Sequence, residues 1–374
     1  MALSWALLIV AIAGAGYLAL ANLQMLFFAR RPLELAVEFL PTITVLKPIL
    51  GDEPKLYENL RSFCDQDYGA PFEVVFAIHR PDDSARATLE RLVGEFPENT
   101  RLAVGENPEL RNPKIANLAK PEAEARGEIV VFADSDIRVG RDYLRAIAAS
   151  FASDRIGATT CLYAAVPNES LVSRMGAMQI EEMFIPSVLV ALTLGKLRFC
   201  MGATMAVRRR LLEEFGGLAA IGSVLADDHR LGELVTARGR DVGLSRYVVR
   251  TTVPERTFGT LWAHELRWAR TNLALAPAGY VFSFLMYAVP FALLYLGVAR
   301  NLAALLLLVL VIALRVGLHY VSRAGLAVNR RDDVALIPLR DFLSLAVWFA
   351  SFFGRRVLWR GHMYSASHAS TGLR

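Results

Sequence analysis

The sequence has few cysteines, and no charged side chain occurs between Ala2 and Phe28. Only Cys64, Cys161 and Cys200 are present in 374 residues, and their spacing is not that of a zinc site. Because the count is odd, a framework in which every cysteine is paired is excluded, and we expect reduced thiols. Basic residues are scattered through an apolar chain and form no patch interleaved with aromatic residues, which argues against nucleic acid as a partner.

The charge-free stretch from Ala2 to Phe28 predicts a membrane-spanning helix. At 1.5 Å per residue it would be about 40 Å long, enough to cross a bilayer with some tilt. It lacks the basic start of a signal peptide, so we expect a retained anchor over residues 1–29. Arg30 and Arg31 follow at once, and the positive-inside rule then places the next residues in the cytoplasm. The net charge of +5 and the pI of about 9.2 fit a protein that lies against anionic lipid.

Long apolar segments return near the C-terminus. Residues 281–299 and 301–321 each predict a span, and Arg315 within the second could snorkel to the surface or pair inside the bundle. Residues 336–354 contain two charges and could cross, re-enter or lie in the interface. We therefore expect a membrane region over residues 281–374, with two or three helices and a basic tail. The tail favours a cytoplasmic C-terminus whereas three crossings would place it outside, and the sequence leaves this open.

Between these segments, residues 38–280 alternate between strand-like and helix-like patterns. The predicted strands are continuous apolar runs, which are typical of parallel strands covered on both faces. This pattern predicts a Rossmann-like α/β domain, whose chemistry lies beyond the carboxyl ends of the strands. The strands are expected at TITVLKP (42–48), EVVFAIH (73–79), RLAVG (101–105) and EIVVFAD (128–134), with helices over 53–64, 84–95 and 113–126.

Two aspartates one residue apart follow the fourth predicted strand, in the sequence ADSD. Asp134 and Asp136 could share Mg²⁺ or Mn²⁺, which prefer oxygen ligands and bridge to phosphate oxygens. Such an ion would neutralise the diphosphate that leaves a nucleotide-sugar. The alternative is a polar loop after a buried strand, so this spacing alone does not decide between them.

Two further pairs of aspartates are candidate site residues. Asp82 and Asp83 in HRPDD follow the second strand, where a carboxylate could bind uracil or ribose or could simply form a turn. Asp227 and Asp228 in LADDHRLGEL lie at a predicted helix start. They could cap that helix, or one of them could be the general base that deprotonates an acceptor hydroxyl.

The stretch HELRWART predicts a helix with Arg267 and Arg270 on one face. Arginine there can fork onto a phosphate and Trp268 can wall the site, although a helix at a membrane surface would carry the same residues. Residues 183–199 are apolar over too short a length to span a bilayer. We expect them to form an interfacial helix that lines the acceptor entrance, with a core helix as the alternative. Beyond it, residues 202–204 are expected to end a strand near the sugar.

Taken together and in order, these motifs resemble the ceramide glucosyltransferase family over residues 40–275. The resemblance implies a membrane-anchored, inverting GT-A glycosyltransferase with N-terminal and C-terminal transmembrane helices. It extends to bacterial hopanoid-associated glycosyltransferases, and the HELRWART and CLY stretches favour the bacterial members. The motifs are VLKPILGDEPKLYENLRSFCDQDY, HRPDDSA, NPKIANL, ADSDIRV, ADDHRLG and HELRW.

Residue by residue, the resemblance implies contact with the nucleotide-sugar at Asp83 and Asp134 and a catalytic base at Asp228. Some relatives have glycine where this chain has Asp136, which strengthens the expectation of a metal here. Lys114 in NPK could meet a phosphate, or it could be a solvated lysine at a helix start.

The helix motif departs from the family at one position. Family members have Gln or Arg where this chain has His264, and the role of this residue is left open. Arg267 and Trp268 then match the family and are expected to stabilise the departing UDP. Arg270 and His264 are expected on the donor side as well.

We therefore expect a UDP-sugar-dependent hexosyltransferase that acts by a single inverting displacement, with Mg²⁺ or Mn²⁺ bound by Asp134 and Asp136. The acceptor is the hydroxyl of a membrane lipid: ceramide, giving a glucosylceramide-type product, or a hopanoid of the bacteriohopanetetrol type glycosylated from UDP-GlcNAc. The expected place is a bacterial inner (cytoplasmic) membrane, with several crossings and the catalytic domain facing the cytoplasm. A processive polysaccharide synthase is a remoter alternative, because it would show Q-x-x-R-W and more spans. A non-catalytic membrane scaffold is another.

Overall fold

The computed structural model describes residues 1–354, 356–359 and 362–365, and part of the predicted basic tail lies outside them. The chain divides into two compact units. The α/β unit contains Pro32–Tyr163 and Lys196–Thr252. The helical unit contains Met1–Arg31, Ala164–Gly195 and Val253–Ser367.

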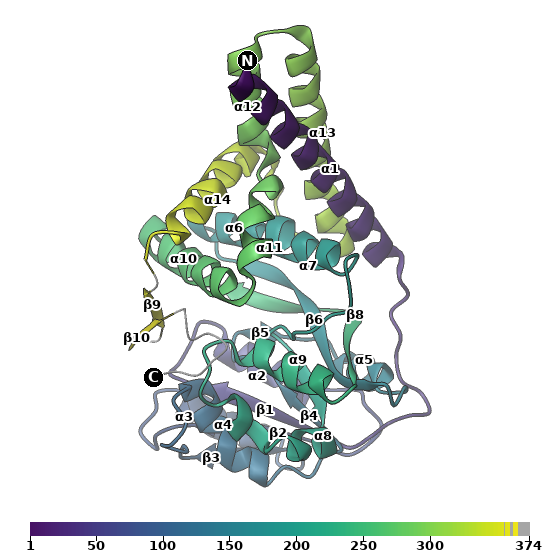
Figure 1. Ribbon diagram of the computed structural model, residues 1–374. Coiled ribbons are helices and arrows are strands. Elements are labelled where there is room, and N and C mark those ends of the chain that lie inside the picture. Colours follow the sequence, from purple (N-terminus) through teal and green to yellow (C-terminus); the bar gives the residue numbers. More distant parts are fainter. Residues whose placement is uncertain (355, 360–361, 366–374) are drawn as a thin grey trace. The chain divides into compact units, whose positions relative to one another are not determined.

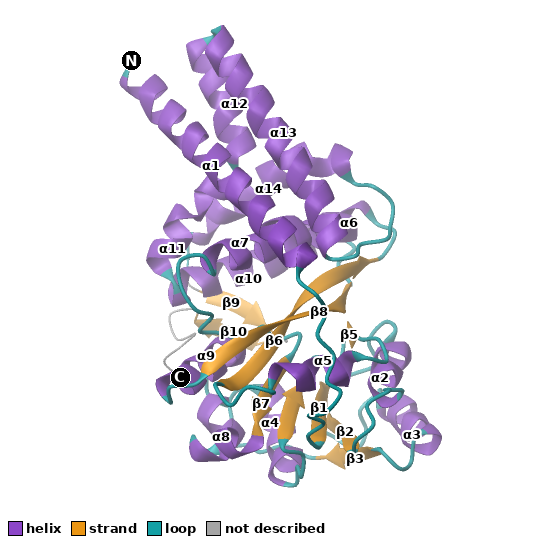
Figure 2. Ribbon diagram, turned by 90° about the vertical axis from the view of Figure 1, so that its right-hand side faces the viewer, coloured by secondary structure: helices purple, strands orange, loops and turns teal. Residues whose placement is uncertain are grey.

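The α/β unit is built on one eight-stranded sheet (Figure 2). Its strands are β1 Ile43–Ile49, β2 Phe72–Ile78, β3 Thr100–Val104, β4 Ile129–Phe132, β5 Ile137–Arg138, β6 Ile156–Pro167, β7 Met205–Arg208 and β8 Asp241–Val253. They lie in the order β3-β2-β1-β4-β7-β6-β8-β5. The first four pair in parallel, as predicted from their apolar runs. The pairs β4–β7, β6–β7 and β5–β8 are antiparallel, and the sequence did not predict this half.

Helices cover both faces of the parallel half (Figures 1 and 2). They confirm the three helices predicted between the first four strands. On one face, Val45 and Ile49 of β1 share a core with Leu60 and Phe63 of α2, because alternate residues of a strand point the same way. The helices of this unit are α2 Leu56–Cys64, α3 Arg86–Glu95, α4 Pro113–Ala123, α5 Tyr143–Ser150, α8 Arg209–Glu214, the 3₁₀ turn η2 Gly217–Ile221 and α9 Asp227–Ala237.

The order of the parallel strands reverses between β1 and β4. From β1 the chain moves outward to β2 and β3, and it then returns to add β4 on the other side of β1. Ligands of open α/β sheets bind beyond the carboxyl ends of the strands at such a reversal. The residues that follow β1 and β4, Leu50–Gly51 and Asp134–Asp136, therefore lie where a ligand is expected.

The helical unit contains the long apolar helices (Figure 1). Its elements are α1 Ala2–Arg30, α6 Leu171–Met178, the π-helix η1 Gln179–Phe184, α7 Ile185–Ala191, α10 Phe258–Leu275, α11 Pro277–Phe282, η3 Ser283–Met286, α12 Ala288–Ala299, α13 Leu302–Gly325, η4 Val334–Leu336, α14 Ile337–Ser351, β9 Arg356–Trp359 and β10 His362–Ser365. Helix α1 packs against α12 and α13. The segment predicted as a helix over 183–199 stops being helical after Ala191.

Three helices among the described residues are long and apolar enough to cross a membrane: Ala2–Arg30, Leu302–Gly325 and Val334–Ser351. The segments Pro277–Met286 and Ala288–Ala299, bent by 60° at their junction, could form a fourth span. Apolar helices at both ends of the chain agree with the expectation from sequence. The part of the chain that the structure describes is therefore compatible with three or four crossings.

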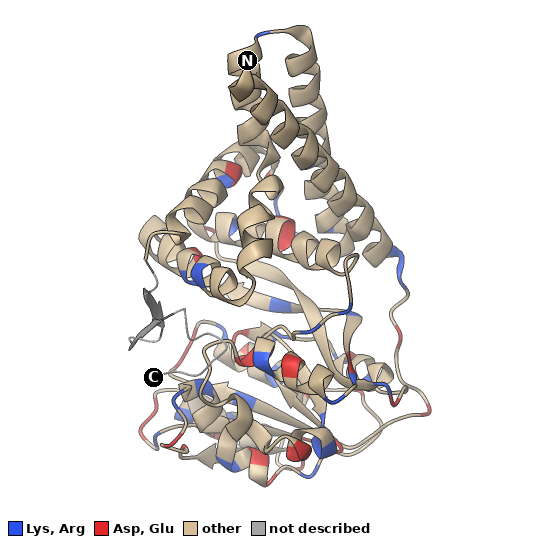
Figure 3. Ribbon diagram, in the orientation of Figure 1, with Lys and Arg blue, Asp and Glu red and all other residues tan. Residues whose placement is uncertain are grey.

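Two arginines inside these apolar helices are paired with carboxylates, and large parts of α1, α12 and α13 carry no charge (Figure 3). Arg315 of α13, which is 1% exposed, donates to Glu182 of η1 at 2.8 Å and to Asp341 of α14 at 3.0 Å. Arg340 binds Glu265 of α10 through two hydrogen bonds of 2.7 Å. Of the two possibilities left open for Arg315, the structure shows pairing inside the helical unit.

Candidate active site

The turn after β4 carries the two aspartates of the ADSD motif. Asp134 keeps 39% of its side chain exposed. Asp136 points inward, and its Oδ2 accepts a hydrogen bond of 2.7 Å from Oγ1 of Thr251. Beneath the turn, the fully buried ammonium of Lys47 donates to the backbone oxygen of Asp134 at 2.5 Å. Burial, followed by the charge of Asp134, raises the pKa of Asp136 to about 6. Asp134 is thus partly exposed, whereas one carboxylate oxygen of Asp136 is held by Thr251.

A buried lysine joins Asp134 to a second acidic pair. The Nζ atom of Lys114 lies 2.9 Å from Oδ1 of Asp134 and 3.1 Å from Oδ2 of Asp227. Lys114 is the second residue of α4, and Asn112 caps that helix by accepting a hydrogen bond from its backbone N–H. Burial opposes the charge of Lys114, but Asp134, Asp227 and Asp228 outweigh it and raise its pKa above the ordinary value. Lys114 is thus a fixed, buried cation and not a solvated lysine.

Asp228 lies in the first turn of α9 next to this cluster. The N-cap residue is Ala226, so the alternative in which an aspartate caps this helix is not what the structure shows. Oδ1 of Asp228 accepts a hydrogen bond from the N–H of His229 at 2.8 Å, and Oδ2 accepts one from the N–H of Gly202 at 3.2 Å. Burial, followed by the charge of Asp227, raises the pKa of Asp228 to about 6. A fixed carboxylate with a pKa closer to neutrality is suited to take up a proton.

Gly202 lies at the point where these charged groups converge. It belongs to a turn before β7, so the expectation that residues 202–204 end a strand is wrong. A β-carbon at this position would lie 3.5 Å from Oδ2 of Asp134, 3.6 Å from Nζ of Lys114 and 3.7 Å from Oδ2 of Asp228. The absent side chain therefore leaves room between the two carboxylates.

A Gly202→Ala variant should fold but transfer sugar poorly. The new methyl group would make only ordinary van der Waals contacts, so we expect little change in Tm. It would occupy the space between Asp134 and Asp228, and we expect kcat/KM to fall by about 10²-fold, as is typical when reacting groups are misplaced. Gly94→Ala is the matched control, because a β-carbon there meets nothing within 4 Å. Unchanged kcat/KM in Gly202→Ala would show that no ligand enters this space.

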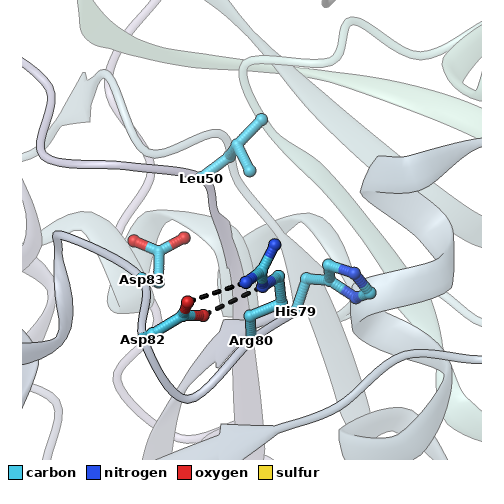
Figure 4. A pocket seen from close by; sticks show the side chains of 5 residues that line it. All are labelled: Leu50, His79, Arg80, Asp82 and Asp83. Carbon is cyan, nitrogen blue, oxygen red and sulfur yellow. Dashed lines mark hydrogen bonds and ion pairs between the residues drawn. The ribbon is translucent and has the colours of Figure 1, made fainter.

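Asp83 follows β2 and holds two loops together. Its Oδ1 accepts hydrogen bonds from the backbone N–H groups of Ala85 at 2.8 Å and Gly51 at 3.1 Å. The Asp82 carboxylate accepts two hydrogen bonds from Arg80, of 2.9 and 2.7 Å. These contacts agree with the alternative that the two aspartates form a turn. The Asp83 side chain also lines a surface pocket (Figure 4). The pocket is lined by Leu50, His79, Arg80, Asp82 and Asp83.

Four predicted site residues lie on α10 in the helical unit: His264, Arg267, Trp268 and Arg270. The ring of His264 meets that of Trp268 edge-on, with centroids 4.5 Å apart. Its Nδ1 atom contacts Oε1 of Glu255, a residue in the loop before α10. Arg270 donates through Nη2 to the backbone oxygen of Phe353 at 2.6 Å. His264 and Trp268 thus form one group, whereas Arg270 is engaged by the chain's own backbone.

Sequence reasoning missed two residues that contact the predicted ones, Lys47 and Glu255, and one contact, that of Asp227 with Lys114. Lys47 lies inside the mostly apolar strand β1. A lysine within such a run, as in VLKP, could have indicated a buried charge near the site. Asp227 was noted, but its pairing with Lys114 depends on two helices that meet only in the folded chain. Glu255 lies in the loop sequence VPERTF, which has no periodic pattern to mark it.

The carboxylates of the turn after β4 suit a hard divalent cation. Asp134 and Asp136 offer oxygen atoms, which Mg²⁺ and Mn²⁺ prefer. Within residues 1–354 and the two short strands beyond, no group of three or more His, Cys, Asp or Glu side chains is placed to hold a metal. Mg²⁺ is commonly bound through only one or two carboxylates, with waters and substrate phosphates as the other ligands. The residues present fit an ion of this kind.

The fold defines the class of protein: a half-parallel, half-antiparallel sheet with an Asp-x-Asp turn after β4 is the GT-A architecture of glycosyltransferases, as predicted. Among solved structures, the chain is similar to the mannosyltransferase PcManGT from Pyrobaculum calidifontis, solved in complex with GDP-Man and Mn²⁺. The two are 21% identical, and the match covers 94% of this chain and 99% of that chain with a TM-score of 0.59. At this identity the likeness establishes the fold alone.

The chain belongs to Glycosyl transferase family 21, whose model matches residues 4–371. It is 25% identical over 240 residues to ceramide glucosyltransferase 1 from Caenorhabditis elegans. This match covers 64% of this chain and 51% of that protein. It is 32% identical over 102 residues to the ceramide glucosyltransferase from Komagataella phaffii, which is 26% of this chain and 20% of that protein. The chain thus spans about half the length, or less, of these relatives. The resemblance to the ceramide glucosyltransferase family is confirmed.

Proposed function

We propose that the protein transfers a sugar from a UDP-sugar to the hydroxyl of a membrane lipid, with inversion and with ceramide as the acceptor. The family match and the names of the relatives support this choice. The observation that carries it is the convergence of Lys114, Asp134 and Asp228 around Gly202. These residues provide a fixed cation, a carboxylate open to a metal and a candidate base around one accessible point.

In the proposed reaction, Asp228 takes the proton of the acceptor hydroxyl as its oxygen attacks the anomeric carbon. The bond from that carbon to the β-phosphate oxygen breaks in the same step, and its electron pair leaves with UDP. Lys114 offers positive charge where the diphosphate develops negative charge. We assign to Arg267 and Trp268 of α10 the role of stabilising the departing UDP. A single displacement of this kind inverts the anomeric centre.

Asp134 and Asp136 would hold a Mg²⁺ or Mn²⁺ ion, which when bound supplies further positive charge for the diphosphate. We expect a chelator to abolish sugar transfer and either ion to restore it. Titration of Mn²⁺, followed by electron paramagnetic resonance, should show weaker binding in Asp134→Asn with an unchanged Tm. Full transfer by chelator-treated wild-type protein would contradict this role for the two carboxylates.

The raised pKa of Asp228 predicts an acid limit to activity. Only the unprotonated carboxylate can act as the base, so kcat/KM should fall about tenfold per pH unit below about pH 6. Above about pH 6 the Asp228 carboxylate is mostly unprotonated, so kcat/KM should no longer depend on pH through this group. A pH profile of lipid glycosylation measures it, with Tm followed in parallel to exclude acid unfolding. A rate that is highest at acid pH would contradict the assignment.

The lipid acceptor is proposed to enter along residues 183–199. This segment starts within η1, continues through α7 and then runs on as turns and irregular chain. Helix α7 packs against α1, the N-terminal candidate span. The Leu194 side chain beyond α7 is 88% exposed, as expected for an apolar residue that meets lipid.

A product assay tests the proposed function. Purified protein in detergent, with Mg²⁺ or Mn²⁺, is given UDP-glucose or UDP-N-acetylglucosamine and either ceramide or bacteriohopanetetrol, and the lipids are read by mass spectrometry. A hexose on ceramide supports the proposal. If only the hopanoid received sugar, the proposed mechanism would stand but the acceptor would be a hopanoid instead of ceramide. Slow hydrolysis of the donor without any glycolipid would overturn the lipid acceptor.

A further inference from the structure

Lys47 is a basic residue in the middle of a buried strand. All seven residues of β1, Ile43–Ile49, are buried, and the Lys47 side chain has no exposed surface. It lies on the same face of the sheet as the core residues Val45 and Ile49, because alternate residues of a strand point the same way. An apolar side chain of similar length would fill this place without the cost of burying an amine. The lysine is therefore explained by something other than packing.

The contacts of Lys47 offset only part of the cost of its burial. Its Nζ atom lies 3.8 Å from the centroid of the Phe63 ring and donates to the backbone oxygen of Asp134 at 2.5 Å. Within the described residues it forms no ion pair, whereas Lys114 has carboxylate oxygens at 2.9 and 3.1 Å. Burial lowers the pKa of Lys47 to about 7, and the charges of Asp134 and Asp136 oppose this effect. The protein thus keeps a costly group beneath one particular turn.

Side chains from the surrounding segments hold each residue of that turn, Asp134–Asp136. The hydrogen bonds run from Lys47 to the backbone oxygen of Asp134 at 2.5 Å, from Ser135 to Glu53 at 2.6 Å and from Thr251 to Asp136 at 2.7 Å. The bond from Lys47 is made to the backbone, at the point where the chain leaves β4. It therefore fixes the path of the chain, in addition to the orientation of any one side chain.

The turn needs such support because it carries two carboxylates. Asp134 and Asp136 repel each other when both are charged, and like charges in one site disfavour ionisation. Without a bound cation, this repulsion would favour an opened turn. A hydrogen bond from a buried side chain to the backbone resists that opening. Groups that orient metal ligands without touching the metal typically change metal affinity by about 10- to 100-fold.

We propose that Lys47 is a positioning residue, which holds the turn Asp134–Asp136 in its cation-binding form before Mg²⁺ or Mn²⁺ binds. The inference rests on the cation site of the proposed function, because it takes the two carboxylates as ligands. Lys47 itself acts through the turn, since its Nζ is directed to the backbone oxygen of Asp134. The amine donates this hydrogen bond in either charge state, so the role requires no titration of the lysine. The cost of burying Lys47 is then a cost in stability that serves a pre-formed site.

The test is hydrogen exchange of the turn, measured by mass spectrometry on the purified full chain in detergent with and without Mn²⁺. In wild type, a peptide that contains residues 133–138 should be protected equally in both conditions, because the turn is already fixed. In Lys47→Met the same peptide should exchange faster without Mn²⁺ and regain its protection at saturating Mn²⁺. A wild-type turn that exchanges rapidly until Mn²⁺ is added would overturn the role, whether or not the variant folds.

Binding of Mn²⁺, followed by electron paramagnetic resonance, is the second readout. Lys47→Met should bind Mn²⁺ about 10- to 100-fold more weakly. Its Tm should change little, because the removed cost of burial and the lost contact with Asp134 act in opposite directions. Sugar transfer by the variant should recover at saturating Mn²⁺, since both carboxylates remain.

The matched control is Lys120→Met, the same substitution at another lysine that donates to a backbone oxygen. Lys120 lies on α4, is exposed, and donates to the oxygen of Val104 at 3.5 Å. Because this contact is away from the turn, Lys120→Met should leave both Mn²⁺ affinity and exchange of residues 133–138 unchanged.

Other outcomes separate this role from packing and from the proposed function. Faster exchange throughout β1 and α2 in Lys47→Met, not reversed by Mn²⁺, would show that the lysine serves only the core and would overturn the inference. Equal or tighter Mn²⁺ binding by Lys47→Met would also overturn it. Mn²⁺ binding that depends on Lys47, without any glycolipid product, would leave the inference standing and contradict the proposed function. No Mn²⁺ binding by wild type would overturn the cation site, and the role of Lys47 with it.

Discussion

An Asp228→Asn variant is expected to lose about 10²- to 10⁴-fold in kcat while it binds UDP as wild type does. Asparagine has nearly the shape of aspartate, and its amide oxygen can still accept the hydrogen bond from Gly202. It has no basic oxygen for the proton of an attacking hydroxyl. The loss should therefore fall on the chemical step, which single-turnover transfer to the lipid measures directly.

The matched control for this variant is Asp154→Asn, the same substitution at a side chain that is 97% exposed. It should leave kcat and UDP affinity unchanged. If Asp228→Asn retained full turnover, the base would have to be another group. If it lost UDP affinity in parallel with kcat, Asp228 would be holding the donor and not the acceptor proton.

An Arg315→Leu variant is expected to lose about 3–5 kcal/mol of stability, the range observed when one partner of a buried ion pair is removed. Arg315 is 1% exposed and lies between Glu182 and Asp341, which are equally buried. Leucine would suit the apolar surroundings but would leave two carboxylates without their counter-charge. Unfolding of the detergent-solubilised protein, followed through Tm and denaturant midpoint, measures the loss.

Two further variants separate charge from size. Arg300→Leu, at the exposed end of α12, also removes an arginine and should change Tm little. A triple variant, Arg315→Leu with Glu182→Gln and Asp341→Asn, removes the charges together and should recover part of the loss, because no carboxylate is then left unpaired. A Tm for Arg315→Leu equal to that of wild type would show that the pairing contributes nothing to stability.

The parallel half of the fold could be predicted because its signals are local. Each of the first four strands is an apolar run of seven residues or fewer, and the intervening helices begin near Asn, Asp or Ser. The antiparallel half depends on distant pairings, such as Ile137 of β5 with Thr251 of β8. No feature of either segment indicates its partner, so the length and order of this half emerge only from the folded chain.

The candidate site was predicted in its residue types but not in its contacts. Asp227 and Asp228 are adjacent in sequence, yet one pairs with Lys114 and the other with Gly202, because successive helix residues point in different directions. The charges at Arg340 and Asp341 weakened the prediction of a span there. In the structure they are the partners of Glu265 and Arg315, and this could be known only after the helices were placed together.

The most direct test of the central claim is the anomeric configuration of the glycolipid made from UDP-α-glucose. The proposed reaction is a single displacement in which Asp228 deprotonates the lipid hydroxyl as it attacks, so the product should be the β-glucoside. Proton NMR of the purified lipid distinguishes β from α through the coupling of the anomeric hydrogen. A β-linked product made by wild type and nearly absent with Asp228→Asn is the predicted result. An α-linked product would contradict the mechanism, because it requires retention at the anomeric carbon.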